Sequence, residues 1–407
     1  MTEPWYDLSS VTPVARGARI AIVGAGIAGA AIADAMSRRG VDAVVFDPDG
    51  PAAGASGNPG GLVMPRLDLG DGAPATFFRD AYLFALEILA RLDPAGAFFN
   101  RCGVTLKATD DEERARQVRL LAAGALPDAH MVSRNEGLHF PTGGVVDPRR
   151  YVSALLGDAE VRRERVIAIE QADDLLLRTK NSTDRFDGIV LANGREAIRL
   201  LPARGLPLTG VAGQIDHFPR VEPPVGAIAA GPYLASAPGG GILVGGTYDR
   251  IEAFATPVAT TASTAENIAA AASLGVVVPA DAESRPRAAV RCQTPDRLPV
   301  VGPLPDWGSY GGAYDDLRFG KRGPYPEATY LSGAFILAGL GSRGLVTAPF
   351  CAEILAAQMV GDAPPASPAV LAALHPARFF IRDYKRARPG KAIDQSQRLR
   401  PETNATD

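Results

Sequence analysis

The 407-residue chain has few cysteines and few histidines. Its three cysteines, Cys102, Cys292 and Cys351, are odd in number and far apart, which argues against a disulfide framework or a Cys-rich zinc site. The four histidines show no ligand spacing, so we expect no metal site. This cysteine usage is typical of a protein that works in a reducing cytoplasm.

Long apolar segments are also missing. The first eighteen residues carry Asp and Pro and lack the apolar run of a secretory signal. The longest apolar stretches, around 330–340 and 268–280, are too short and too rich in small or polar residues to cross a bilayer. We therefore expect no membrane segment.

The chain lacks a large excess of either charge. Its 42 Lys plus Arg against 45 Asp plus Glu give a net charge of −3, unlike a general nucleic-acid binder. Any nucleic-acid site must be a local basic patch. The strongest candidate is the stretch 378–400, which has eight basic residues against two aspartates. Its alternative interpretation is a solvated terminus.

The composition present is that of a folded globular protein, with 46% hydrophobic and 21% charged residues. The length leaves room for two or three domains, or for one large α/β unit with an insertion.

A βαβ unit opens the folded region. The β-branched run Arg19–Gly24 predicts a strand buried on both faces, 27–39 a small apolar helix, and Asp42–Asp47 a second buried strand. Further buried strands are expected at 161–169, 175–179 and 188–192, and a strand, a glycine loop and a helix over 329–359. Short β-branched runs separated by Pro and Gly within 210–248 indicate an antiparallel sheet. Residues 304–326 read as a long loop.

The glycines after the first strand form a dinucleotide-binding fingerprint. Gly24, Gly26 and Gly29 spell GxGxxG between a strand and a helix, and Asp47 ends the next strand. Gly24 allows a tight turn, Gly26 lets the backbone approach a pyrophosphate, and Gly29 allows close helix packing. The first turn of the helix, Ile27 and Ala28, would direct its N–H groups at the phosphates, and Asp47 would accept from a ribose diol.

Both NAD and FAD use this fingerprint, and the rest of the chain favours FAD. A glycine-rich segment, 54–62, follows the ribose acid directly, and a second glycine loop, 339–344, opens a helix near the C-terminus. Two loops without bulky side chains suit a large flat ring whose edges need backbone contacts.

Several motifs then carry a family resemblance. GASGNPGGLVMPRL from Gly54, VRCQTPDRLPVVG (Val290–Gly302) and GLGSRGLVTAPF from Gly339 resemble the glycine and D-amino-acid oxidase superfamily. With GGVVDPRRY, GQIDHFP, GGTYDR and HPARFFIRDY, the chain most resembles the FAD-dependent oxidoreductase domain of the bifunctional MnmC family. That family acts in the biosynthesis of 5-methylaminomethyl-2-thiouridine in tRNA. The resemblance runs from about 19 to 384.

The resemblance implies an α/β fold with a Rossmann-type FAD-binding domain and an inserted mixed or antiparallel-sheet substrate domain. The expected ranges are 17–75, 145–210 and 327–385 for the FAD-binding domain, 76–144 and 211–326 for the substrate domain, and 386–407 for a basic C-terminal tail.

The implied reaction is FAD-dependent removal of the carboxymethyl group from 5-carboxymethylaminomethyl(-2-thio)uridine at the tRNA wobble position. The products would be 5-aminomethyluridine and glyoxylate. The family's methyltransferase half has no counterpart in the eighteen residues before Arg19, so we expect no methylation by this chain and regard a separate methyltransferase as a candidate partner.

The resemblance also suggests site residues. Arg291 matches the carboxylate-binding arginine of glycine-oxidase-like relatives, with a structural ion pair as its alternative. Arg343 is a second candidate for substrate or cofactor. Tyr248 and Gln214 lie in motifs expected near the substrate, with ordinary core or sheet hydrogen bonding as the alternative for each. Noncovalent FAD is expected, because the attachment cysteine of sarcosine oxidases is replaced by Ala. Besides the fingerprint residues, the expected cofactor contacts are Ser56, Asn58, Gly61, Leu62, Val166, Ala192, Gly341, Ser342, Arg343, Gly344 and Leu345.

Two other functions stay open. One is a FAD-dependent oxidase of a free small amine such as glycine, sarcosine or a D-amino acid, which the acidic net charge favours. The other is a flavin-containing tRNA-binding protein without turnover, whose flavin would stay oxidised on anaerobic mixing with substrate.

Overall fold

The structure is a computed structural model, and it describes residues 3–134, 137–171, 175–200, 205–251 and 254–386. A six-stranded sheet forms the base of the molecule, in the order β20-β21-β13-β1-β2-β9. All neighbouring pairs run parallel except β20 with β21. The strands are β1 (Arg19–Val23), β2 (Asp42–Phe46), β9 (Glu160–Arg162), β13 (Gly188–Leu191), β20 (Val300–Pro305) and β21 (Tyr330–Ala338).

Both faces of this sheet are covered, which explains the unbroken apolar runs in its strands. Ile20 and Ile22 pack into the core with the helices, whereas Ala21 and Val23 pack into a second core with a three-stranded sheet. The helices are α1 (Ile27–Ser37), α2 (Ala73–Leu92), α4 (Pro148–Leu156), α7 (Gly344–Val360) and α8 (Pro368–Leu374). The covering strands are β10 (Val166–Gln171), β11 (Leu175–Thr179) and β12 (Thr183–Phe186).

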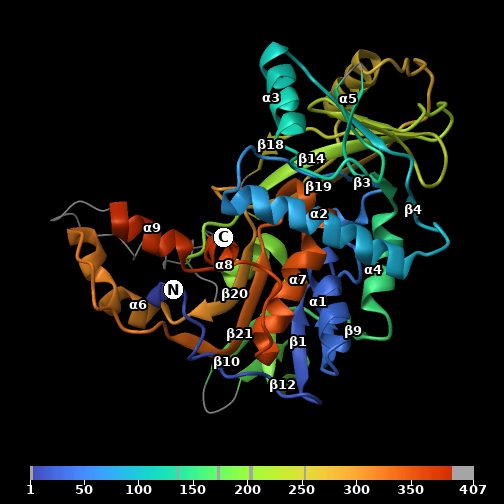
Figure 1. Cartoon of the computed structure of the whole chain (residues 1–407). Helices are drawn as coiled ribbons and strands as arrows, with labels where there is room; N and C mark the ends of the chain where they lie inside the picture. The colour runs from blue at the N-terminus through green and yellow to red at the C-terminus, as the bar shows by residue number, and fades with distance from the viewer. Residues whose placement is uncertain (1–2, 135–136, 172–174, 201–204, 252–253, 387–407) are drawn as a thin grey trace.

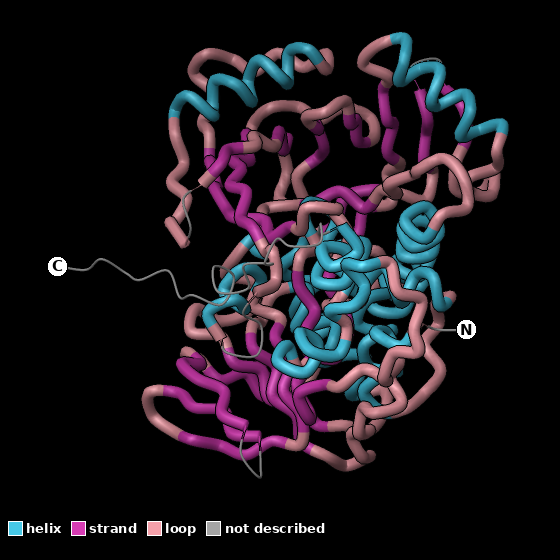
Figure 2. Tube along the Cα trace, turned by 90° about the vertical axis from the view of Figure 1, so that its left-hand side faces the viewer, coloured by secondary structure: helices cyan, strands magenta, loops and turns pink. Residues whose placement is uncertain are grey.

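A nine-stranded sheet, in which β19 pairs with β14, forms a second layer at the opposite end of the molecule. Figure 1 shows α3 (Asp111–Ala122) and α5 (Thr261–Ser273) at the top beside it, away from β1 and α1, and Figure 2 shows helices between the two regions of strands. Its strands are β5 (Val104–Lys107), β6 (Val132–Arg134), β7 (Gly137–Phe140), β14 (Thr209–Phe218), β15 (Ala227–Ala229), β16 (Tyr233–Ser236), β17 (Ile242–Gly245), β18 (Asp249–Arg250) and β19 (Arg285–Gln293). A small sheet joins β3 (Gly61–Val63), β8 (Gly144–Val146) and β4 (Phe99–Asn100).

The predicted α/β architecture is confirmed, with three local differences. The run 161–169 forms two strands in two different sheets, β9 and β10. Residues 304–326, predicted to be a loop, contain the end of β20, α6 (Trp307–Ala313) and the 3-10 helix η5 (Asp315–Phe319). Finally, α2 was assigned to the substrate domain but packs against α7, with the Phe77 and Phe350 rings 6.2 Å apart.

The predicted basic stretch 378–400 is in part a folded helix. Its first residues form α9 (Arg378–Arg386). The buried Arg378 pairs with Asp296 at 2.9 Å, and Lys385 pairs with Glu3 at 3.2 Å. These cations are therefore engaged in internal contacts and do not form a solvated tail. The rest of the stretch lies outside the described residues.

Candidate active site

A cleft of about 900 Å³ lies where the carboxyl ends of the parallel strands meet the second sheet. Its walls come from the turn after β1, the segment 53–62, the end of β13, the strand β19, and the glycine loop before α7. Ligands in open α/β sheets bind at this edge. The fold thus brings the two predicted glycine loops, from opposite ends of the chain, into one cavity.

Most of the predicted site residues line this cleft. The exceptions are Gly29 and Gln214, which do not line it. The residues it brings together are Gly24, Gly26, Ile27, Ala28, Asp47, Ser56, Asn58, Gly61, Leu62, Val166, Ala192, Tyr248, Arg291, Gly341, Ser342, Arg343, Gly344 and Leu345.

The fingerprint glycines are required by close backbone contacts. Gly24 has a φ of 107°, and a Cβ there would lie 2.8 Å from the Ala192 carbonyl oxygen. A Cβ at Gly29 would lie 1.9 Å from the Gly24 oxygen. Gly29 therefore acts through helix packing, the role that the sequence assigns it, and need not touch a ligand.

Polar side chains hold the turn around Gly26 in place. The Asp47 carboxylate accepts from the Ala25 N–H at 2.9 Å, and the Ser56 hydroxyl accepts from the Ile27 N–H at 2.9 Å. Asn193, which sequence analysis did not single out, also lines the cleft, and its buried Oδ1 has no hydrogen-bond partner in the described structure. A buried acceptor without a protein partner is available to a donor from a bound ligand or a water. With the glycine turn, this orphan acceptor shows that the cleft suits a dinucleotide such as FAD.

Gln214 has a structural role. Its buried amide nitrogen donates to Asp216 at 3.0 Å and Thr264 at 2.9 Å, and its oxygen accepts from the Thr260 N–H at 2.8 Å. These contacts tie β14 to the start of α5. The side chain does not reach the cleft, so the structure does not bring Gln214 to the substrate position suggested for it.

Arg291 and Tyr248 lie together in the cleft wall. The guanidinium donates to the Thr247 carbonyl at 2.5 Å, and its carbon is 4.1 Å from the Tyr248 ring centroid. The Tyr248 hydroxyl is 3.1 Å from Ser342 Oγ in the glycine loop. Among the described residues Arg291 has no acidic partner, so the alternative of a structural ion pair does not apply to it.

Tyr233 is a cleft residue that sequence analysis missed. It lies on β16. Burial raises the pKa of its hydroxyl, although the nearby Arg291 charge opposes the shift. The phenol therefore stays protonated at neutral pH and can donate a hydrogen bond. The sequence pattern that could have pointed to Tyr233 was the alternation of side chains along the short strand 233–236.

Arg343 supplies a second cation to the cleft. Its Nη1 donates to the Met64 carbonyl at 3.4 Å, and no acidic side chain of the described residues pairs with it. Burial lowers its pKa, and the nearby Arg66 charge acts in the same direction. An arginine stays charged despite such a shift. The site therefore holds an uncompensated positive charge beside the glycine loop.

Two further arginines hold the loop 53–58, and one of them, Arg287, also lines the cleft. Arg287 on β19 donates to Asn58 Oδ1 at 2.9 Å and to the Ala53 and Gly54 carbonyls at 2.8 Å. Arg149 donates to the Gly57 carbonyl at 3.1 Å. Neither residue was predicted. Arg287 precedes Arg291 by four positions on one strand, so the period-2 pattern placed both on the same face.

Cys292 lies beside Arg291 and also lines the cleft. Burial raises the pKa of its thiol to about 12. A protonated thiol is a poor nucleophile, which agrees with the expectation of noncovalent cofactor binding.

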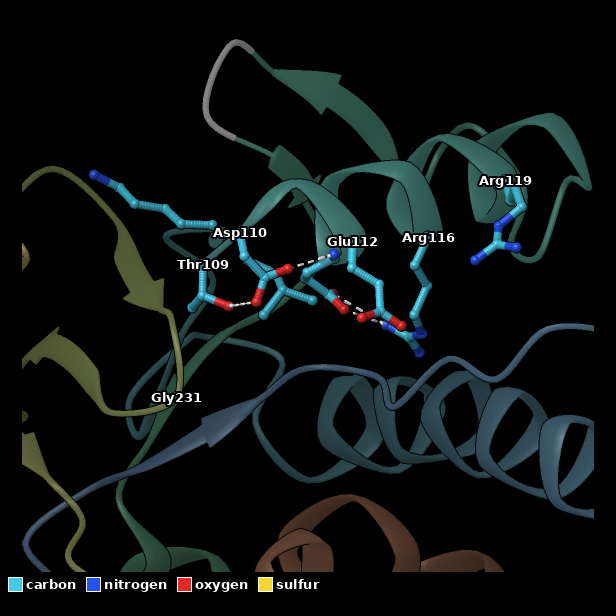
Figure 3. A pocket seen from close by; sticks show the side chains of 9 residues that line it. Thr109, Asp110, Glu112, Arg116, Arg119 and Gly231 are labelled. Atoms are coloured by element: carbon cyan, nitrogen blue, oxygen red, sulfur yellow. Dashed lines mark hydrogen bonds and ion pairs between the residues drawn. The ribbon is translucent and has the colours of Figure 1, made fainter.

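A smaller pocket of about 300 Å³ lies at the start of α3 (Figure 3). There Asp110 caps the helix by accepting from the Glu113 N–H at 2.8 Å, and Glu113 pairs with Arg116 at 3.1 Å. Its charges are mostly used within the helix, so we place the chemistry in the large cleft. In the part of the chain that is described, no His, Cys, Asp and Glu side chains gather as a metal site, and no helix is long and apolar enough to span a bilayer.

Comparisons with known proteins agree with FAD binding in this cleft. The family model for FAD dependent oxidoreductases, abbreviated DAO, matches residues 19–358. A tRNA 5-methylaminomethyl-2-thiouridine biosynthesis bifunctional protein MnmC from Chromohalobacter salexigens is 32% identical over 418 residues. That match covers 93% of this chain but only 58% of the relative.

Two solved structures share the fold. Iminodiacetate oxidase from Chelativorans sp. BNC1 has a TM-score of 0.67 at 22% identity, with 86% of this chain and 97% of that chain covered. Glycine oxidase from Geobacillus kaustophilus has a TM-score of 0.67 at 20% identity, with 89% of this chain and 99% of that chain covered.

Proposed function

The chain belongs to the DAO family of FAD dependent oxidoreductases, and on that premise we propose that it removes the carboxymethyl group from 5-carboxymethylaminomethyl(-2-thio)uridine at the wobble position of tRNA. The products are 5-aminomethyluridine and glyoxylate. The reacting unit is a secondary amine, a glycine whose nitrogen carries the nucleobase through one methylene. Its oxidation converts the bond between nitrogen and the acid-bearing carbon into an imine, which water hydrolyses.

The observation that carries the proposal is Arg291, a half-buried cation in the wall of the cofactor cleft that pairs with no acidic side chain of the described residues. A guanidinium matches a carboxylate with two parallel hydrogen bonds. Arg291 therefore binds the acid end of the glycine unit. The Tyr233 hydroxyl, kept protonated by burial, donates a further hydrogen bond to the same acid.

FAD, when bound, supplies the two-electron acceptor for the C–H bond. The residues proposed to hold it are those of the glycine turn after β1, with Asp47, Ser56 and Asn193, and those of the loop before α7. The N-terminal turn of α7, Gly344 and Leu345, adds the positive end of a helix dipole to the same cleft. Together these groups hold the cofactor and favour negative charge beside it.

Holding the carboxylate also orients the bond that breaks. A substrate fixed at its acid end presents the adjacent carbon in one position, which converts a bimolecular encounter into a positioned one. The second cation, Arg343, lines the same cleft beside Ser342 and favours negative charge that develops during oxidation. No protein nucleophile or metal ion is required for this reaction, because water attacks the imine.

The tRNA substrate is supported by the 32% identity to a tRNA-modifying relative over 93% of the chain. Because the chain spans 58% of that bifunctional relative's length, we assign only the oxidation to residues 19–358. A methyltransferase acting on the 5-aminomethyluridine product is the candidate partner. The protein is proposed to work in the cytoplasm, where tRNA is modified.

A second candidate function is oxidation of a free small amine. The net charge of −3 favours it, because phosphate contacts need surface cations. One experiment separates the two functions. Purified protein is incubated with tRNA carrying the carboxymethyl form, and with free glycine or sarcosine. Mass loss at the wobble base with glyoxylate release supports the tRNA reaction, whereas turnover of the free amines alone contradicts it.

A further inference from the structure

One part of the cleft wall is used neither by the predicted cofactor contacts nor by the proposed acid site. Arg195 and Arg199 lie on the 3-10 helix η3 (Gly194–Arg199), and Phe254 lies in the connection between β18 and α5. All three line the large cleft. We call Arg195, Arg199 and Phe254 the Phe254 rim.

The three side chains form one stacked unit. The guanidinium carbon of Arg199 is 4.5 Å from the Phe254 ring centroid, and that of Arg195 is 5.7 Å away. Such cation–π contacts hold the guanidinium groups over the aromatic ring. The rim therefore offers one aromatic ring and two guanidinium planes in a single place.

Arg195 fixes the rim to the second sheet. Its Nη2 donates to the Ala255 carbonyl at 2.7 Å. It also packs against β14, where a Cβ at Gly210 would lie 2.7 Å from its Nη1. Arg195 is thus a positioning residue that holds the backbone beside Phe254.

Phe254 itself is held in an uncommon conformation. Its φ is 62°, in the left-handed region that bulky side chains rarely adopt. Such a conformation persists only where the surroundings fix it, and it is found more often at functional positions. The ring is therefore placed by its neighbours.

Arg199 is the exposed member. Half of its side-chain surface is accessible, and its ion pair is with Glu196 of the same helix, at 3.1 Å. An exposed pair of this kind contributes little energy, so a stronger anion can replace it. Arg165 lines the cleft as well, is exposed, and has no partner among the described residues.

We propose that the Phe254 rim binds a second nucleotide of the single-stranded anticodon loop, with its base on Phe254 and a phosphate at Arg199. Unpaired RNA bases stack on aromatic rings and on guanidinium planes. The substrate base and its neighbour then occupy the same cleft, one at Arg291 and the other at the rim. This inference rests on the proposed function, because it takes tRNA as the substrate.

The chain provides a matched control. On η5, Arg318 lies over Phe319, with the guanidinium carbon 5.2 Å from the ring centroid, and it pairs with Asp315 three positions earlier. Phe319 is 57% exposed, and neither residue lines the cleft. The Phe254 rim and the Arg318–Phe319 pair thus both place an arginine over a phenylalanine ring, but only the rim lines the cleft.

The test measures three quantities on the protein and its variants, with FAD bound in the RNA-binding and oxidation assays. These are affinity for an unmodified anticodon stem–loop RNA, affinity for FAD, and oxidation of the free modified nucleoside. We expect Phe254→Ala and Phe254→Leu to weaken stem–loop binding about tenfold. Arg199→Gln should also weaken it and reduce the slope of log affinity against log salt by about one. FAD affinity and nucleoside oxidation should stay as in the wild type, as should all three quantities in Phe319→Ala.

Unchanged stem–loop affinity in the rim variants would overturn the inference. So would an equal loss in Phe319→Ala, or a parallel loss of FAD affinity, which would assign the rim to the adenine of the cofactor. Phe254→Leu keeps an apolar side chain at this position, so a loss of RNA binding in that variant reports the missing aromatic ring and not misfolding. The proposed function fails separately, if the wild type binds the stem–loop but does not release glyoxylate from the modified form.

Discussion

Tyr248 covers Arg291 with its ring and reaches Ser342 with its hydroxyl. The guanidinium carbon lies 4.1 Å from the ring centroid, and the two hydroxyl oxygens are 3.1 Å apart. A cation–π contact of this kind contributes about 0.5–2 kcal/mol. The cation proposed to bind the substrate acid is thus connected through one side chain to the loop proposed to hold the flavin.

Replacing Arg291 tests the acid site. We expect Arg291→Ala to lower kcat/KM for the modified tRNA about hundredfold, near 3 kcal/mol, because a charged hydrogen-bonded partner is lost. The flavin absorbance should be unchanged. Steady-state kinetics and absorbance spectra measure both. Arg285→Ala is the control, because Arg285 is exposed on the same strand and pairs with Glu283 at 2.7 Å. Wild-type kinetics in Arg291→Ala would remove this residue from the site.

Replacing Arg287 tests the support of the loop 53–58. Arg287→Gln removes donors to three acceptors, and each such hydrogen bond contributes about 1 kcal/mol. We expect the Kd for FAD to rise about ten- to hundredfold and FAD to dissociate faster, as measured by fluorescence. Arg285→Gln should match the wild type. If FAD binds Arg287→Gln normally, the loop is held by its other contacts.

His375 predicts acid sensitivity of the fold. Burial lowers its pKa to about 3, and the Arg378 charge acts in the same direction. The unfolded chain therefore binds this proton near its ordinary pKa of about 6.5, before the folded protein does. Stability contributed by neutral His375 is present above that pH and falls by about 1.4 kcal/mol per pH unit below it.

Urea unfolding at a series of pH values measures this effect. The Ala377 N–H donates to Nδ1 at 3.1 Å, and Nε2 lies 3.1 Å from the Tyr330 hydroxyl. His375→Gln should lose this part of the slope between about pH 6 and 4, whereas His217→Gln, at a partly exposed position on β14, should keep it. An unchanged slope in His375→Gln would mean that other groups govern acid unfolding.

The C-terminal stretch is tested by truncation after Arg386. This cut preserves α9, whose Tyr384 is buried, and removes 387–407. If the remaining basic residues contact phosphates, tRNA affinity should fall more than the oxidation rate of a small amine. Binding assays at two salt concentrations and a glyoxylate assay make the comparison. Equal losses would point to an effect on folding.

Local requirements were predictable from the sequence. Gly24 is required by its φ of 107° in the turn after β1, and Gly29 by its close contact with Gly24 inside one βαβ unit, so the spacing of the fingerprint identified both. Arg287 could have been predicted by extending the alternation of side chains from Arg291 back along the same strand, to residues before the VRCQTPD motif.

Other features depend on distant partners. Gln214 is engaged by Thr260 and Thr264 of another element, and no local pattern marks that network. The helices within 304–326 are similarly held by aromatic packing, with the Trp5 and Tyr314 rings 5.9 Å apart. A glycine-rich stretch can thus become helical because of residues near the N-terminus.

Arg287 and Arg291 both lie on β19. Arg287 donates hydrogen bonds to the loop 53–58, and Arg291 is proposed to bind the substrate carboxylate. Strand geometry makes their separation a fixed length of roughly 13 Å. Inserting or deleting one amino acid between them would rotate one guanidinium to the reverse side of the sheet. This segment should therefore tolerate substitutions but not a one-residue insertion or deletion, and a redesign for a bulkier acid must enlarge the cleft elsewhere.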